Sequence, residues 1–83
     1  MLKIDIRFIA DELAPGFVSG IYEIEDGASV RDLLKLCEKK FGKTLPPANY
    51  DLMYPLFEGK PIFIDGAIPK SGTLHLCRVI IGG

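Results

Sequence analysis

The last two residues, Gly82 and Gly83, are the pair whose type and position could carry chemistry. A terminal carboxylate is ionised at neutral pH and resists nucleophilic attack, because hydroxide is a poor leaving group. An ATP-dependent enzyme removes that obstacle by converting the carboxylate into an acyl-adenylate. Glycines lack a Cβ, so they pass through a narrow channel and adopt the backbone angles that it imposes. The pattern predicts a chain end that another protein activates at Gly83, with Ile80, Ile81 and Gly82 threading into that protein.

Histidine and cysteine offer little competing chemistry. His75 is the only histidine, and no acidic or cysteine partner accompanies it in a motif. Cys37 and Cys77 form no CxxC pair and are too few for a disulfide framework, so neither zinc nor iron–sulfur binding is indicated. Because no nucleophile, base and orienting group occur together, we expect no catalytic residues, no metal site and no enzyme activity.

Composition narrows the class of protein further. A chain of 83 residues has room for one hydrophobic core, which predicts a single domain over residues 1–83. The formal net charge of −1 gives no electrostatic footprint for nucleic acid. No apolar run approaches the length of a membrane span, and the low cysteine content fits a reduced compartment. We therefore expect a cytoplasmic protein that binds neither nucleic acid nor membrane.

The N-terminal part of the sequence predicts a β-hairpin. Apolar and polar residues alternate over residues 2–8, which is the period of a strand with one buried face. A break at residues 14–16 precedes a second alternating segment over residues 18–25. The two segments are expected to pair.

A helix is predicted to follow this hairpin. Ser29 occupies an N-cap position with Asp32 three residues later, the helix begins at Val30, and Gly42 ends it. The 3.6-residue period gives one buried stripe, made of Val30, Leu33, Leu34, Cys37 and Phe41. The same period turns a second set toward water, made of Arg31, Lys35, Glu38 and Lys39.

The C-terminal half predicts shorter strands. Residues 46–47 are both proline and indicate an extended connector, and Pro55 confines the strand expected over residues 52–57 to an edge or a bulge. A turn over residues 58–60 leads to a short strand over residues 61–64. A continuous β-favouring run over residues 73–81 predicts the last strand.

Strand, strand, helix, short strands, strand is the order of the α+β β-grasp fold, a mixed sheet of about four to five strands with one main helix. In that arrangement the last strand lies beside the first, at the sheet centre. Leu74 and Leu76 should then point at the helix, while His75, Cys77 and Val79 face the uncovered side. Apolar surface there, next to the tail, predicts a partner-binding face of Cys77, Arg78 and Val79, with Arg78 placed to meet a partner's acidic group.

Over essentially its whole length the sequence resembles the ThiS and MoaD sulfur-carrier family and, more distantly, ubiquitin. The tail over residues 79–83 looks like the family's tail, and the opening strand followed by residues 11–13 is similar to the start of MoaD-type chains. Residues 29–34 resemble the family's helix entry. Residues 71–74, Ser-Gly-Thr-Leu, stand where the family usually has a Gly-Asp turn, and the segment over residues 45–55 is longer than in the family.

The resemblance implies two partners, an E1-like adenylating enzyme and a sulfur-accepting synthase. The enzyme would use ATP and magnesium, and the chain itself would bind no cofactor. Gly83 would become a thiocarboxylate whose sulfur enters a cofactor of the thiamine or molybdopterin type, and the tail over residues 82–83 would be flexible. Two alternatives stay open: a ubiquitin-like modifier joined to lysine through Gly83, and an interaction subunit in which the glycines are incidental.

Overall fold

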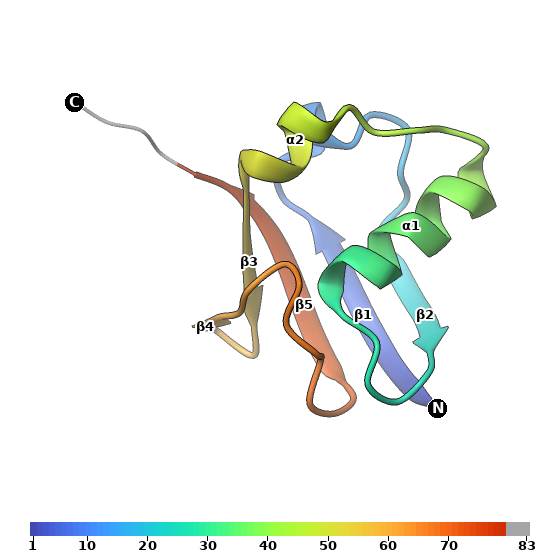
Figure 1. Ribbon diagram of the computed structural model, residues 1–83, viewed down its shortest axis with the longest axis vertical. Helices are drawn as coiled ribbons and strands as arrows, with labels where there is room; N and C mark the ends of the chain where they lie inside the picture. The colour runs from blue at the N-terminus through green and yellow to red at the C-terminus, as the bar shows by residue number, and fades with distance from the viewer. Residues whose placement is uncertain (80–83) are drawn as a thin grey trace.

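A five-stranded mixed sheet, crossed on one face by a long helix, forms the structure, a computed structural model that describes residues 1–79 (Figure 1). The strand order is β2-β1-β5-β3-β4. The elements follow the chain as β1 (Leu2–Phe8), η1 (Asp11–Leu13), β2 (Gly20–Ile24), α1 (Val30–Phe41), α2 (Pro47–Asp51), β3 (Met53–Phe57), β4 (Lys60–Pro61) and β5 (Gly72–Arg78). This architecture confirms the predicted β-grasp fold. The predictions made for Ile80, Ile81, Gly82 and Gly83 lie outside the described residues.

The three strands β2, β1 and β5 form the part of the sheet that was predicted best. β1 pairs antiparallel with β2 and parallel with β5, so the last strand does lie beside the first. The second strand begins at Gly20, later than the predicted start at residue 18. The Phe8 N–H donates at 3.0 Å to the Ser19 hydroxyl, so a side chain takes the place of the next backbone partner. The ladder ends there.

Helix α1 has the predicted boundaries because both of its ends are capped by the predicted residues. The Ser29 hydroxyl accepts from the Asp32 N–H at 3.1 Å, and the Asp32 carboxylate accepts from the Ser29 N–H at 2.9 Å. Gly42 has φ of 65°, the left-handed conformation that glycine adopts without a steric penalty. Four stripe residues, Val30, Leu33, Leu34 and Cys37, are completely buried.

Glu38 was predicted to face water, and that prediction is wrong. Its side chain is buried, the Leu45 N–H donates to its Oε2, and the Lys35 ammonium lies 3.2 Å from its Oε1. Burial alone would raise the pKa of Glu38, but the hydrogen bond and the lysine outweigh it and lower that pKa. The buried carboxylate therefore ties the chain after α1 back onto the helix.

The predicted extended connector at the two prolines is also wrong, because a short helix, α2, begins there. Pro46 is extended and acts as the N-cap, while Pro47 occupies the first helical turn, where a missing N–H costs nothing. The Asn49 amide donates to the Leu13 carbonyl at 2.9 Å, which joins α2 to η1. Both elements lie at the end of the sheet where β5 finishes (Figure 1).

Strand β3 lies between β5 and β4, so the edge predicted from Pro55 belongs to β4 instead. The Pro55 carbonyl accepts from the Ile62 N–H at 3.1 Å, on the side away from β5. The nitrogen and carbonyl of one strand residue point the same way, so Pro55 removes no bond to β5. Glu58 and Gly59, both with positive φ, make the tight turn into β4, which is only two residues long.

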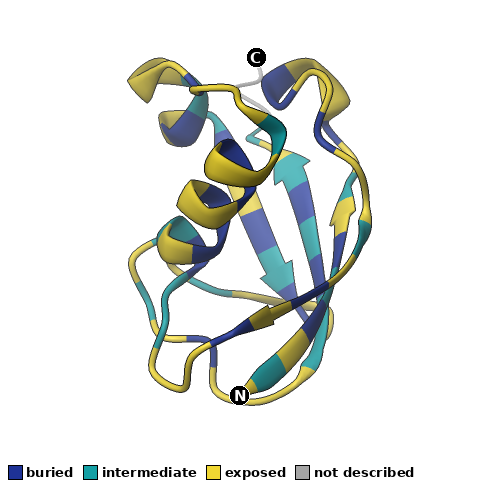
Figure 2. Ribbon diagram, turned by 90° about the vertical axis from the view of Figure 1, so that its right-hand side faces the viewer, coloured by how far each residue is buried: buried dark blue, intermediate teal, exposed yellow. Residues whose placement is uncertain are grey.

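The core lies between α1 and the sheet face that it covers, and buried residues alternate with less buried ones along the strands (Figure 2). At one end of this layer Phe17 packs edge-on against Phe8, with ring centroids 5.6 Å apart, and lies 5.4 Å from the Phe41 ring. The loop before β2 is thereby fixed over the end of α1. Among residues 1–79, no helix is both long enough and apolar enough to cross a membrane.

Candidate functional site: the uncovered sheet face and the base of the tail

Strand β5 presents two chemically different faces. Leu74 and Leu76 are 0% and 2% exposed beneath α1, whereas His75 and Cys77 are half-buried on the other side of the sheet. The predicted strand register is therefore confirmed. The binding role of the uncovered side stays a prediction.

The uncovered side brings residues of β3 next to β5. Tyr54 lies opposite Cys77, and Leu56 lies opposite His75. Tyr54 keeps 44% of its surface exposed. Together with Val79, which alternation places on the same side, Tyr54, Leu56 and Cys77 form what we call the uncovered patch.

The β3 members of this patch, Tyr54 and Leu56, were not predicted from the sequence. The signal was available in principle, because Met53, Pro55 and Phe57 alternate with Tyr54 and Leu56 and are all buried. Pro55 predicts an edge strand from its missing N–H, and that prediction says nothing about the two side chains that face outward.

The apolar surface continues from Tyr54 toward β4. A groove there has Tyr54, Pro55, Ile62 and Phe63 among its lining residues. Phe63 is 87% exposed, the largest exposure of any large apolar residue among those described. A partner that covered the uncovered patch would therefore find further apolar contacts at its margin.

Arg78 lies at the end of β5 and already has a partner within the chain. Its Nη1 is 3.5 Å from Glu12 Oε1, and both side chains are about half exposed. Such exposed ion pairs contribute little to stability and are readily exchanged. The predicted pairing of Arg78 with a partner's acidic group would require this exchange.

The base of the tail is anchored to the domain. Arg78 is in register with Met53, and the Val79 N–H donates at 2.8 Å to the carbonyl of Leu52, the residue that ends α2. The last described residue is thus held by the sheet and by α2 together. The segment that would carry the chemistry, residues 80–83, starts from this fixed point.

The two cysteines lie in opposite environments and are both free. Cys37 belongs to the buried stripe of α1, and burial raises the pKa of its thiol to about 11, with Lys40 opposing that rise. Since the thiolate is the reactive form, Cys37 is a packing residue. Among residues 1–79, no group of three or more histidine, cysteine and carboxylate side chains is arranged to hold a metal ion.

Neither a protein-family model nor a curated protein sequence matches this chain. Solved structures do. A putative molybdopterin converting factor, subunit 1, from Pyrococcus furiosus is similar with a TM-score of 0.67 and 18% identity, covering 96% of this chain and 100% of that one. SAMP1 from Haloferax volcanii is similar with a TM-score of 0.59 and 17% identity, covering 99% and 98%.

A designed protein based on ubiquitin has a TM-score of 0.61 and 16% identity, over 98% of this chain and 92% of that one. At such identities the similarity shows the fold. The chain thus has the ubiquitin-like β-grasp fold that the resemblance to the sulfur-carrier family implied. What it does must be argued from its own residues.

Proposed function

We propose that this chain is a cytoplasmic sulfur carrier, not itself an enzyme, that works through the carboxylate of Gly83. An E1-like enzyme adenylates that carboxylate with ATP and magnesium, and the resulting thiocarboxylate delivers sulfur to a synthase that builds a cofactor of the thiamine or molybdopterin type. The fold shared with the molybdopterin converting factor supports this proposal, and so does the Gly-Gly ending.

The proposed chemistry has two steps. The Gly83 carboxylate attacks the α-phosphorus of ATP and displaces pyrophosphate, which leaves an acyl-adenylate. A sulfur donor of the sulfide class then attacks the acyl carbon, a C–S bond forms, the C–O bond breaks, and AMP leaves. The thiocarboxylate is a strong nucleophile that stays attached to its carrier until it is used.

The observation that carries the proposal is the anchoring of the tail. β5 lies at the sheet centre, between β1 and β3, and the Val79 N–H is bound to the Leu52 carbonyl. An enzyme that grips the domain therefore receives the tail from a defined point. The partner enzyme binds the folded domain, and residues 80–83 extend from it to the enzyme's active site.

The uncovered patch is the surface that we propose the partner enzymes bind. Its apolar members lie on the same strands that lead to and flank the tail, and no element among residues 1–79 covers this side of the sheet (Figure 2). The adenylating enzyme and the synthase would bind the same patch in turn, because each must receive the same four-residue segment.

Pyrophosphate exchange catalysed by the adenylating enzyme tests the proposal. The complete chain should support ATP–pyrophosphate exchange, whereas the chain lacking Gly83 and the Gly82→Val variant should not. Both variants should keep the melting temperature of the parent. Exchange at the parent rate with either variant would contradict the proposal.

The product of activation distinguishes a sulfur carrier from a ubiquitin-like modifier. With sulfide present, the activated chain should gain sulfur and stay a single species on a denaturing gel. Isopeptide-linked conjugates to lysine would assign it to the ubiquitin-like modifiers instead.

A further inference from the structure

The free edge of β2 carries unpaired backbone groups whose positions follow from the hydrogen bonds of β1. The Lys3 N–H donates to Ser71, on the β5 side, whereas the Phe8 N–H donates to Ser19, on the β2 side. N–H and carbonyl groups alternate sides along a strand, so the odd residues of β1 point away from β2. Their register partners, Glu23 and Ile21, then point their own N–H and carbonyl groups outward.

No other described element pairs with this edge. β2 is the outermost strand on its side of the sheet, and among residues 1–79 the outward groups of Ile21 and Glu23 have no hydrogen-bond partner. Proteins usually protect such edges with charge or a covering loop. Here the apolar side chain of Ile21, on the same edge, is 69% exposed. Another strand that paired with β2 would gain both backbone hydrogen bonds and an apolar contact.

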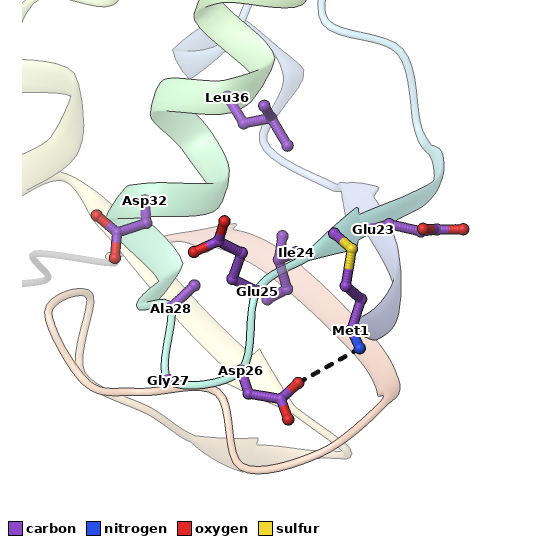
Figure 3. A pocket seen from close by; sticks show the side chains of 9 residues that line it. All are labelled: Met1, Glu23, Ile24, Glu25, Asp26, Gly27, Ala28, Asp32 and Leu36. Carbon is purple, nitrogen blue, oxygen red and sulfur yellow. Dashed lines mark ion pairs between the residues drawn. The ribbon is translucent and has the colours of Figure 1, made fainter.

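A groove runs beside the edge, between β2 and α1 (Figure 3). Its volume is about 500 Å³, and Ile24 from the strand and Leu36 from the helix provide apolar walls. Leu36 is 42% exposed although it belongs to the main helix. A strand added to β2 would place alternate side chains in this groove and bury Leu36.

The charged side chains that line the groove are acidic. Glu25, Asp26 and Asp32 line the end next to Ile24, where Asp26 also lies 3.7 Å from the Met1 ammonium (Figure 3). Lys40, whose ammonium is 4.6 Å from the Tyr22 ring, lies on α1 beyond the residues that line the groove. A segment with cationic side chains beside Ile24 would be complementary to this pattern, and an acidic segment would be repelled.

We infer that β2 is a docking edge for an extended segment of a partner protein, added antiparallel to the strand, with apolar side chains in the groove and lysine or arginine at its N-terminal end. Antiparallel addition is the more stable pairing and brings that end next to Ile24. This surface is separate from the tail and the uncovered patch. It would let the chain hold one protein while Gly83 engages another.

A synthetic peptide tests the inference directly. The probe is a fluorescein-labelled peptide of alternating valine and threonine that begins with lysines. It is titrated into the complete chain, and amide exchange is measured by NMR with and without the peptide. Exchange at the Ile21 and Glu23 amides should slow on binding, while the Tyr22 amide, already bonded to β1, should not change.

Two matched variants sharpen the test. Ile21→Pro removes an outward N–H and no bond to β1, so it should weaken peptide binding on the order of fivefold or more while α1 keeps its amide protection. Glu25→Lys should weaken binding of the lysine peptide about threefold or more and improve binding of a peptide that begins with glutamates.

Removal of Gly83 should leave peptide binding unchanged, so this inference and the carrier proposal can fail separately. Protection that appears at Ile21 and Glu23 without peptide, and that rises with protein concentration, would assign the edge to a second copy of the chain and overturn the inference. Peptide-induced changes at Tyr54 and Cys77 in place of β2, or equal binding of the glutamate peptide, would also overturn it.

Discussion

The two faces of β5 differ in how far their side chains are buried. Leu74 and Leu76 on one face are buried against α1, and His75 and Cys77 on the other are open to contact from outside. Adjacent residues of one strand therefore differ in burial, and under the proposed function the less buried ones bind the partner that receives the tail. A substitution one position along the strand should therefore change which property is lost.

The largest effect is expected from Leu76→Arg. The side chain is 2% exposed, so a charge there would be buried without a partner. We expect destabilisation by about 4 kcal/mol or more, enough to unfold a domain of this size. Urea unfolding followed by circular dichroism measures it. A folded Leu76→Arg variant would invert the inward and outward assignments on β5.

Val79→Arg should separate binding from stability. The half-buried side chain belongs to the uncovered patch and lies beside the tail, so a partner that receives the tail would cover it. A charge buried in such an interface typically costs about 2 kcal/mol of binding free energy. The free energy of unfolding should change by under about 0.5 kcal/mol. Calorimetric titration with the adenylating enzyme measures the first quantity.

Thr73→Arg is the control for that experiment. It lies on the same face at the far end of β5 and should leave the affinity unchanged. Equal losses of affinity in Val79→Arg and Thr73→Arg would indicate a general effect of the added charge. The uncovered patch would then not be the surface that the enzyme binds.

Glu38→Gln tests the buried carboxylate of α1. Loss of its charge should cost about 1–2 kcal/mol, because the Leu45 N–H and Lys35 lose an ionised partner. The folded-state pKa of Glu38 lies below its ordinary value of about 4.3. The stabilisation is therefore fully present above the ordinary pKa of about 4.3, which applies to the unfolded chain. It is lost as the pH falls through the lower folded-state pKa.

The variant should consequently show a weaker loss of stability on acidification than the parent. The exposed Glu23 provides a control for the substitution itself, and Glu23→Gln should change the free energy of unfolding at pH 7 by under about 0.5 kcal/mol. Parallel pH profiles for the parent and Glu38→Gln would count against the role given to this carboxylate.

The smallest effect on the fold is expected from the thiols. Cys77 should react with a thiol reagent in the native protein at pH 8, with little change in melting temperature. Cys37 should stay unreacted until the protein unfolds, since it is buried and its pKa is raised to about 11. Mass spectrometry of the labelled peptides distinguishes the two cysteines. Native labelling of Cys37 would show that α1 opens readily.

Much of this architecture was predictable because it rests on local signals. The cap residues Ser29, Asp32 and Gly42 mark the ends of α1, and strand alternation assigns Leu74 and Leu76 to the core. These features depend on periodicity and on backbone groups at helix ends, both of which are visible in a sequence.

The wrong predictions for Glu38, the two prolines of α2 and Pro55 share a physical cause. Each depends on a hydrogen-bond partner in another segment of the chain, or on the direction in which a backbone group points. Glu38 is buried because the Leu45 N–H requires an acceptor, and helical periodicity contains no such information. The helix that Pro47 begins is held in place by the hydrogen bond from the Asn49 amide to the Leu13 carbonyl. Pro55 sits inside the sheet because its nitrogen points away from β5. For the site, the β5 members of the uncovered patch were predictable, and the β3 members required the register.

The most direct test of the carrier account is the mass of the C-terminal peptide after the chain is incubated with its adenylating enzyme, ATP, magnesium and sulfide. We expect one product, in which sulfur replaces an oxygen of the Gly83 carboxylate, and no product when ATP is omitted. A Gly83 that remains an unmodified carboxylate under conditions where the enzyme thiolates its own known carrier, or one found only in isopeptide linkage to lysine, would contradict it.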